Sequence, residues 1–137
     1  MKHFPIAHTF SIVAYDPASG QMGVAVQSHW FSVGSVVTWA EAGVGVVATQ
    51  ALVETSYGPL GLEKMKNRIS TPQALMELLA ADELREVRQV AMVDAQGRND
   101  VYTGNRCMEA AGHVKGENFS VQANMMLNDE VVPAMAK

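Results

Sequence analysis

The stretch from His8 to Trp30, HTFSIVAYDPASGQMGVAVQSHW, decides how the rest of the chain is arranged. Side chains of residues 10–15 fall into two alternating sets, which is the period of a β-strand with two distinct faces. Pro17 and Gly20 then mark a tight turn, because proline presets φ and glycine accepts a positive φ. Residues 23–27, GVAVQ, return as a second strand. The stretch therefore predicts an antiparallel hairpin.

The predicted hairpin gathers polar residues at its open end. In an antiparallel pair, the start of the first strand lies beside the end of the second. We therefore expect Thr9 to lie close to Gln27, Ser28 and His29. A threonine hydroxyl beside a serine and a histidine is a candidate catalytic site.

Composition is typical of one well-cored domain. The 137 residues, 48% apolar and 18% charged, predict a single domain over 1–137. A net charge of −4 argues against a nucleic-acid partner. The N-terminus lacks the apolar core of a signal peptide, and no stretch approaches the ~20 apolar residues of a membrane span. We expect a cytoplasmic protein with no membrane partner and no cofactor.

The remaining chain is predicted to form strands, two helices and then strands again. Strands are predicted at residues 35–40, 44–49, 89–94, 100–103 and 119–123. Apolar residues at helical spacing from Leu60 to Ile69 predict the first helix, and Thr71 followed by proline begins the second. Residues 82–88 are predicted to be a solvated connection, and residues 131–137 resemble the start of a further helix. Strands grouped apart from helices favour an α+β fold.

Two helices can cover only one face of one sheet. The other apolar faces then require a second sheet, more helices or a partner subunit. On this ground we expect a homo-oligomer.

Six blocks of the chain together resemble one protein family. They are TFSIVAYDPASGQMGVAVQSHW (9–30), AGVGVVATQ (42–50), SYGPLGLEKM (56–65), VRQVAMVDAQGR (87–98), YTGNRCMEAAGH (102–113) and FSVQANMM (119–126). In this order they resemble the domain-of-unknown-function-1028 family, from Thr9 to about Met135. Members of that family are commonly described as N-terminal-nucleophile (Ntn) hydrolases. The resemblance implies an αββα four-layer sandwich of antiparallel sheets, with a C-terminal part of the family beyond the present chain.

The resemblance also implies a chemistry for Thr9. In an Ntn hydrolase, the first residue of the mature chain attacks a carbonyl while its own α-amine takes the proton. An α-amine with a pKa of about 8 is partly neutral at physiological pH and can act as this base. Eight residues precede Thr9, so residues 1–8 would be an N-terminal extension or a propeptide removed after His8. The alternative is a threonine that only begins a strand.

Several other residues are candidates to assist Thr9. Ser28 and His29 stand where such a fold would place residues that support the nucleophile, although His29 could equally be exposed at a strand end. Asn124, which follows a predicted strand, is a candidate oxyanion donor. For substrate binding, Gln50 could present an amide. Ser56 and Tyr57 open a helix whose backbone N–H groups could hold an anion, or they form an ordinary helix cap.

Other chemistries find less support in the sequence. The four histidines, His3, His8, His29 and His113, show neither HxH nor HxxxH spacing, so we predict no metal site. Cys107, the single cysteine, could be a nucleophile beside His113, but a structural thiol is the more common case. GVGVVATQ lacks the P-loop lysine and the GxGxxG spacing of nucleotide-binding proteins.

Two functions remain as predictions. The first is an Ntn-type hydrolase of a small, unidentified amide or peptide, with Thr9 as nucleophile and Ser28, His29 and Asn124 as helpers. The alternative is a non-catalytic ligand-binding or oligomeric protein on the same fold.

Overall fold

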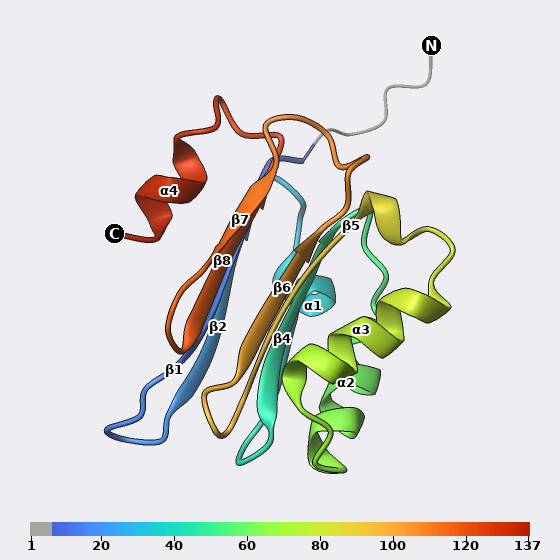
Figure 1. Ribbon diagram of the computed structural model, residues 1–137. Helices are drawn as coiled ribbons and strands as arrows, with labels where there is room; N and C mark the ends of the chain where they lie inside the picture. Colours follow the sequence, from blue (N-terminus) through green and yellow to red (C-terminus); the bar gives the residue numbers. More distant parts are fainter. Residues whose placement is uncertain (1–6) are drawn as a thin grey trace.

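Two four-stranded antiparallel sheets lie face to face in the computed structural model, which describes residues 7–137 (Figure 1). The first sheet contains β2 (Met22–Ser28), β1 (Thr9–Tyr15), β8 (Phe119–Asn124) and β7 (Gly112–Lys115), in that order. The second contains β3 (Thr38–Glu41), β4 (Gly45–Ala51), β5 (Arg88–Asp94) and β6 (Asn99–Thr103). The helices of the described residues are α1 (Gly34–Val37), α2 (Tyr57–Lys66), α3 (Thr71–Ala81), α4 (Val131–Met135) and a 3₁₀ turn at Arg85–Val87.

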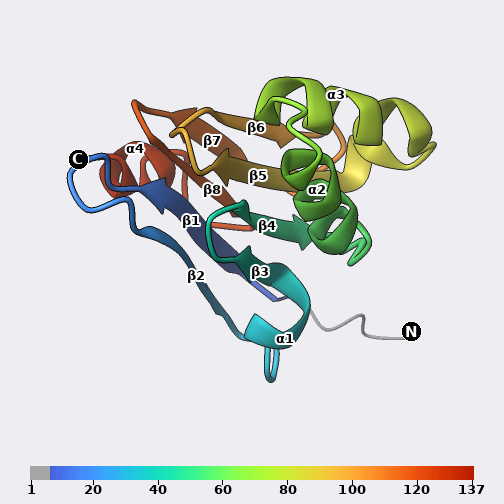
Figure 2. The same ribbon diagram turned by 90° about the horizontal axis from the view of Figure 1, so that it is seen from below.

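The layers follow the order helix, sheet, sheet, helix. Helices α2 and α3 cover the outer face of β4 and β5, where Leu62 and Leu75 pack on Val47 and Met92. On the opposite side, α4 packs Val132 against the outer face of β8. Figure 2 separates α4 on one side of the two sheets from α2 and α3 on the other. The fold is therefore α+β, as predicted, with both sheets partly covered on their outer faces.

The predicted hairpin within residues 8–30 is confirmed, and Thr9 lies beside Ser28 as expected. Thr9 pairs with Ser28, and Phe10 pairs with Gln27, whose side chain is exposed. The other edge of β1 is occupied by β8, which pairs Asn124 with Thr9. A strand more than a hundred residues later in the chain thus completes the surroundings of Thr9.

Several predicted elements differ from the structure. Residues 34–37 form helix α1, whereas a strand was predicted from residue 35, because local hydrogen bonds satisfy this backbone: Val37 N–H donates to Val33 O and Thr38 Oγ1 donates to Gly34 O. Leu60 is exposed and does not join the buried stripe of α2. Strand β7 was not predicted, since Gly112 weakens the strand pattern there.

Residues 82–88 are only in part the solvated connection that their charges predicted, since residues 83–85 are exposed but Arg88 is not. Arg88 is buried at the start of β5, and its guanidinium pairs with the Asp82 carboxylate, with Nε 2.9 Å from Oδ2. Pairing removes the cost of burying either charge alone, which composition cannot reveal.

The turn between β5 and β6 requires a glycine. Gly97 has φ +76°, and a Cβ there would lie 2.2 Å from Asn118 Oδ1 and 2.9 Å from Tyr15 Cδ1. Gly43 has a similar φ of +73° but no atom within 4 Å of the corresponding position. Both substitutions to alanine therefore carry backbone strain, and only Gly97→Ala adds a clash between the sheets.

We expect Gly43→Ala to lower the free energy of unfolding by about 1 kcal/mol and Gly97→Ala to lower it by about 3 kcal/mol. Urea unfolding of the two variants measures the difference. Equal losses at the two sites would contradict the packing described for this turn.

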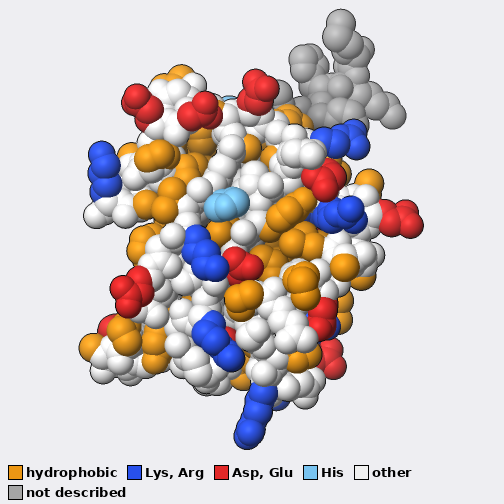
Figure 3. Space-filling view, viewed as in Figure 1, with side chains coloured by type: hydrophobic (Ala, Val, Ile, Leu, Met, Phe, Trp, Pro, Cys, Tyr) orange, Lys and Arg blue, Asp and Glu red, His pale blue; other side chains and the backbone are white. Residues whose placement is uncertain are grey.

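The surface carries a shallow groove away from the inter-sheet space. It measures about 640 Å³ and runs between α3 and β6, lined by Met76, Leu79, Tyr102 and their neighbours. Hydrophobic side chains gather over this part of the face in Figure 3. Within residues 7–137, no helix combines the length and the apolar character needed to cross a membrane.

Candidate functional site

One end of the space between the sheets carries the densest group of buried polar side chains. Toward the other end, Val13 of β1 packs against Val46, Val93 and further valines and alanines of the second sheet. At the polar end, the inward residues of the first sheet pair in register as Ser28, Thr9 and Asn124. Facing them, the second sheet pairs Gln50, Gln89 and Thr103. This layer lies at the upper end of the sandwich in Figure 1, where β1 begins and β8 ends.

The Thr9 hydroxyl lies within this layer, and the residue is only 7% exposed. Its Oγ1 donates to Ala7 O at 2.9 Å and lies 2.8 Å from Ser28 Oγ. Because a threonine hydroxyl carries one hydrogen, Ser28 is then the donor in the second contact. Ser28 Oγ in turn accepts from Trp30 N–H at 3.1 Å. In the uncut chain, the hydroxyl hydrogen of Thr9 is therefore hydrogen-bonded to the carbonyl oxygen of Ala7, in the segment that precedes Thr9.

Gln89 is the centre of the amide contacts in the same layer. Its Nε2 lies 2.8 Å from Ala123 O and 3.0 Å from both Gly112 O and Thr103 Oγ1, so its two hydrogens are shared among three acceptors. Its Oε1 accepts from Gln50 Nε2 at 2.8 Å and from Asn124 Nδ2 at 3.1 Å. Gln50 Nε2 also lies 3.5 Å from Thr9 O. Gln50, Gln89 and Asn124 are all fully buried.

A further buried amide lies one layer deeper. Gln122 Nε2 donates to Ser11 Oγ and to Ala48 O, both at 3.1 Å, and so joins the two sheets. Among the residues that the structure describes, Gln50 Oε1, Gln122 Oε1 and Asn124 Oδ1 have no hydrogen-bond partner. Buried acceptors without a donor are uncommon and indicate a place where a further donor fits.

His29 lies at the surface beyond this layer. Its ring meets the His8 ring edge to face, with 5.1 Å between centroids, and both side chains are exposed. His8 Nδ1 contacts Met125 O. His29 thus lies beside the residue that precedes Thr9, and the contacts found for its ring are with His8.

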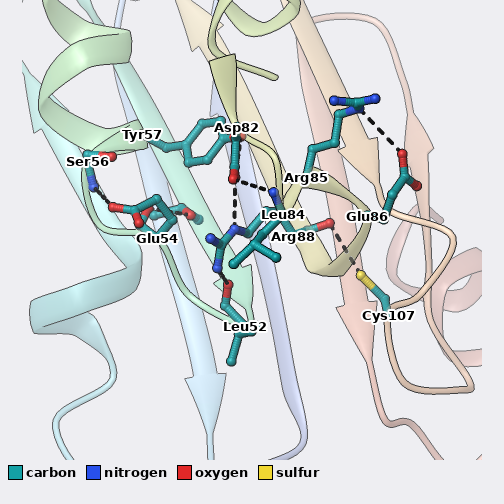
Figure 4. A network of polar contacts seen from close by, with 11 residues as sticks. Leu52, Glu54, Ser56, Tyr57, Asp82, Leu84, Arg85, Glu86, Arg88 and Cys107 are labelled. Carbon is teal, nitrogen blue, oxygen red and sulfur yellow. Dashed lines mark hydrogen bonds and ion pairs between the residues drawn. The ribbon is translucent and has the colours of Figure 1, made fainter. Parts of the chain in front are cut away.

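Ser56 and Tyr57 belong to a different part of the molecule. Tyr57 is buried at the start of α2, on the outer side of the second sheet, and its hydroxyl donates to Asp82 Oδ2 at 3.0 Å (Figure 4). Burial and this contact raise the Tyr57 pKa above its ordinary value. Ser56 N–H donates to Glu54 Oε1 at 3.1 Å, so the helix start already holds a carboxylate of the chain itself.

The chain matches a known protein family. A family model described as "Family of unknown function (DUF1028)" matches residues 9–137. This chain belongs to the DUF1028 family.

A solved structure of the same family supports the assignment. The crystal structure of protein SPO2555 from Silicibacter pomeroyi, a DUF1028 protein, is similar to this chain with a TM-score of 0.89 and 28% sequence identity. The similarity covers 94% of this chain and 57% of that protein, so the present DUF1028 chain spans little more than half of its length. Comparison with curated proteins found no match.

Cys107 of this DUF1028 chain does not pair with a histidine. Its thiol donates to Arg88 O at 3.3 Å, whereas His113 Nδ1 contacts Thr103 Oγ1 at 2.9 Å. Burial raises the pKa of the Cys107 thiol, which disfavours the nucleophilic thiolate. Desolvation also lowers the His113 pKa. Over residues 7–137, no three metal-ligating side chains gather at one place, and His3 lies outside the described residues.

Sequence reasoning missed Gln89 and Gln122, although a signal for both was present. Each glutamine lies in a buried strand next to apolar residues, in RQVAMVD and in FSVQAN. A long amide within a buried strand needs buried partners, so such residues indicate a polar network between layers. The DUF1028 chain has both on the inner faces of its sheets.

Proposed function

We propose that this protein is an Ntn-type amide or peptide-bond hydrolase in which Thr9 acts after the His8–Thr9 bond has been cleaved. Its substrate would be a small amide, and the helix–sheet–sheet–helix layers would be an Ntn-hydrolase fold. The observation that carries the proposal is the Thr9 hydroxyl, 2.8 Å from Ser28 Oγ at the end of a buried polar layer. The DUF1028 match, which begins at residue 9, gives further support.

The proposed reaction uses the Thr9 side chain and its own α-amine. Thr9 Oγ1 bonds to the substrate carbonyl carbon while its proton passes to the α-amine. The tetrahedral intermediate then collapses, the carbon–nitrogen bond breaks, and the leaving amine takes that proton. Water next attacks the resulting ester, releases the acid and restores the hydroxyl. Ser28 donates a hydrogen bond to Thr9 Oγ1 and can hold it in place for attack.

The predicted helpers and substrate-binding residues lie in different parts of the molecule. Asn124 and Gln50 stand in the same layer as Thr9 and are kept in the proposed site. His29, beside His8, is suited to assist cleavage of the His8–Thr9 bond more than the later reaction. Ser56 and Tyr57 stand on the outer side of the second sheet and make no contact with Thr9.

The proposal is tested by comparing the activity of a chain that begins at Thr9 with that of the full chain. We expect the shortened chain to hydrolyse members of a panel of acyl p-nitroanilides, and the full chain, whose residue 9 has an amide nitrogen, to be inactive. Acetylating the Thr9 α-amine should abolish the activity, because it removes the base and leaves the hydroxyl intact. Equal activity with a free and a blocked α-amine would rule the mechanism out.

A non-catalytic, self-associating protein is the second candidate. Large apolar side chains beyond the strand ends favour it: Phe31 and Leu127 are each 94% exposed and Trp30 is 51% exposed. This candidate predicts a stable oligomer by light scattering and no hydrolysis by the chain that begins at Thr9.

A further inference from the structure

The amide of Gln89 has a fixed orientation. Two of the three groups around its Nε2 are the backbone carbonyls of Gly112 and Ala123, which can only accept hydrogen bonds. A reversed amide would bring Gln89 Oε1 against these two oxygens. Its Oε1 therefore points to the other side, toward Gln50 and Asn124.

The orientation of Gln89 determines that of both neighbours. Gln89 Oε1 can only accept, so Gln50 must present Nε2 to it at 2.8 Å and Asn124 must present Nδ2 at 3.1 Å. Reversing either neighbour would bring two acceptor oxygens together. The oxygens of Gln50 and Asn124 are consequently turned away from Gln89.

The side-chain oxygens of Gln50 and Asn124 are left as acceptors in the layer that contains Thr9. Gln50 Oε1 and Asn124 Oδ1 are buried and have no hydrogen-bond partner among residues 7–137. A buried acceptor that lacks a donor is destabilising. Asn124 pairs in register with Thr9, and Gln50 Nε2 lies 3.5 Å from Thr9 O. The missing donor is thus expected at the N-terminus of β1.

We propose that Gln50 Oε1 and Asn124 Oδ1 form an acceptor pair for the α-amine of Thr9 in the cleaved chain, with Gln89 as the positioning residue. The inference rests on the proposed function. A neutral α-amine has two N–H donors and one lone pair. Two acceptors that bind the two N–H groups leave the lone pair free to take the proton of Thr9 Oγ1. The role of Asn124 is then that of an acceptor, in place of the oxyanion donor predicted from the sequence.

The test measures the α-amine itself in the chain that begins at Thr9. Nitrogen NMR of ¹⁵N-threonine-labelled protein follows the α-amine pKa, and the pH dependence of kcat/KM follows its role as a base. Gln89→Met keeps the side-chain length but removes the amide, so Gln50 and Asn124 lose their fixed orientation. Acceptor oxygens favour the charged ammonium, so their loss should lower the α-amine pKa by about 0.5 to 1 unit.

The rising limb of kcat/KM should move to lower pH by the same amount, and its plateau should fall by about tenfold or more. Gln122→Met is the matched control, because Gln122 is equally buried but bonds Ser11 and Ala48 O instead of Gln89. It should leave the α-amine pKa unchanged. Gln50→Met removes one of the two acceptors, together with the donor to Gln89 Oε1, and should shift the α-amine pKa by about half as much. It provides the test if Gln89→Met does not fold.

The two ideas fail in different ways. An active enzyme whose α-amine pKa is the same in the wild-type, Gln89→Met and Gln50→Met chains would overturn the acceptor pair while leaving the proposed function standing. A chain that shows the expected pKa shifts but hydrolyses no amide would support the acceptor pair and count against the hydrolase.

Discussion

Replacing Thr9 by alanine in a chain that begins at residue 9 should lower amide hydrolysis by about 10³-fold or more. The substitution removes the hydroxyl that would form the covalent bond and keeps the α-amine, and loss of a nucleophile is among the costliest single changes in an enzyme. Thr9 is buried at the start of β1, but alanine is smaller than threonine and adds no clash there. The rate of p-nitroaniline release from a cleaved acyl p-nitroanilide gives the measurement.

Two matched variants separate chemistry from structure. Thr9→Ser keeps the hydroxyl and should retain part of the activity, because only the methyl group is lost. Ser28→Ala removes the donor 2.8 Å from Thr9 Oγ1 and should reduce the rate by about tenfold, since the hydroxyl is then less firmly held. Undiminished hydrolysis by Thr9→Ala would assign the nucleophile to another residue.

Replacing Arg88 by methionine should lower the free energy of unfolding by about 3 kcal/mol, because it leaves the partly buried Asp82 carboxylate, with a side chain only 16% exposed, without its cation. Figure 4 shows the guanidinium between Asp82 and Leu52, whose carbonyl oxygen accepts from Nη1 at 2.6 Å. Lys66→Met is the control, since it breaks an exposed ion pair with Glu41 and should leave the urea midpoint unchanged. Equal effects of the two substitutions would contradict a structural role for the buried pair.

The effect of Arg88→Met should also depend on pH. Burial alone would raise the Asp82 pKa, but hydrogen bonds from Arg88, Leu84 N–H and Tyr57 outweigh it and hold the pKa below its ordinary value. A carboxyl with a lowered pKa in the folded state contributes stability above its unfolded pKa of about 3.9, and this contribution is lost as the pH falls through the folded value. The difference in stability between wild type and Arg88→Met should therefore be smaller at pH 3 than at pH 7.

The sequence was most informative where structure is local. The hairpin of residues 8–30 could be predicted, because alternation and turn residues lie within one short stretch. The proximity of Thr9 and Ser28 followed from the antiparallel pairing, whereas the exact register came from the structure. Helix α1 was not predictable in this way, because β-branched residues at 36–38 favour a strand and local hydrogen bonds favour the helix.

The polar layer could not be derived from sequence patterns, because its members come from strands far apart in the chain. Gln50 and Gln89 meet through β4 and β5, and Asn124 reaches them only because β8 inserts beside β1. Pairing of strands separated by so many residues depends on the whole fold. Asn124 and Gln50 were predicted as site residues, but Gln89, which orients both, became apparent only from the contacts between the sheets.

The most direct test of the central claim is the intact mass of the protein, measured on the same preparation from its native host that is assayed for amide hydrolysis. The proposed function predicts that active protein has lost residues 1–8 and begins at Thr9. Hydrolysis by a preparation whose mass includes residues 1–8 would contradict it, because the Thr9 nitrogen would then be an amide and could not take the proton.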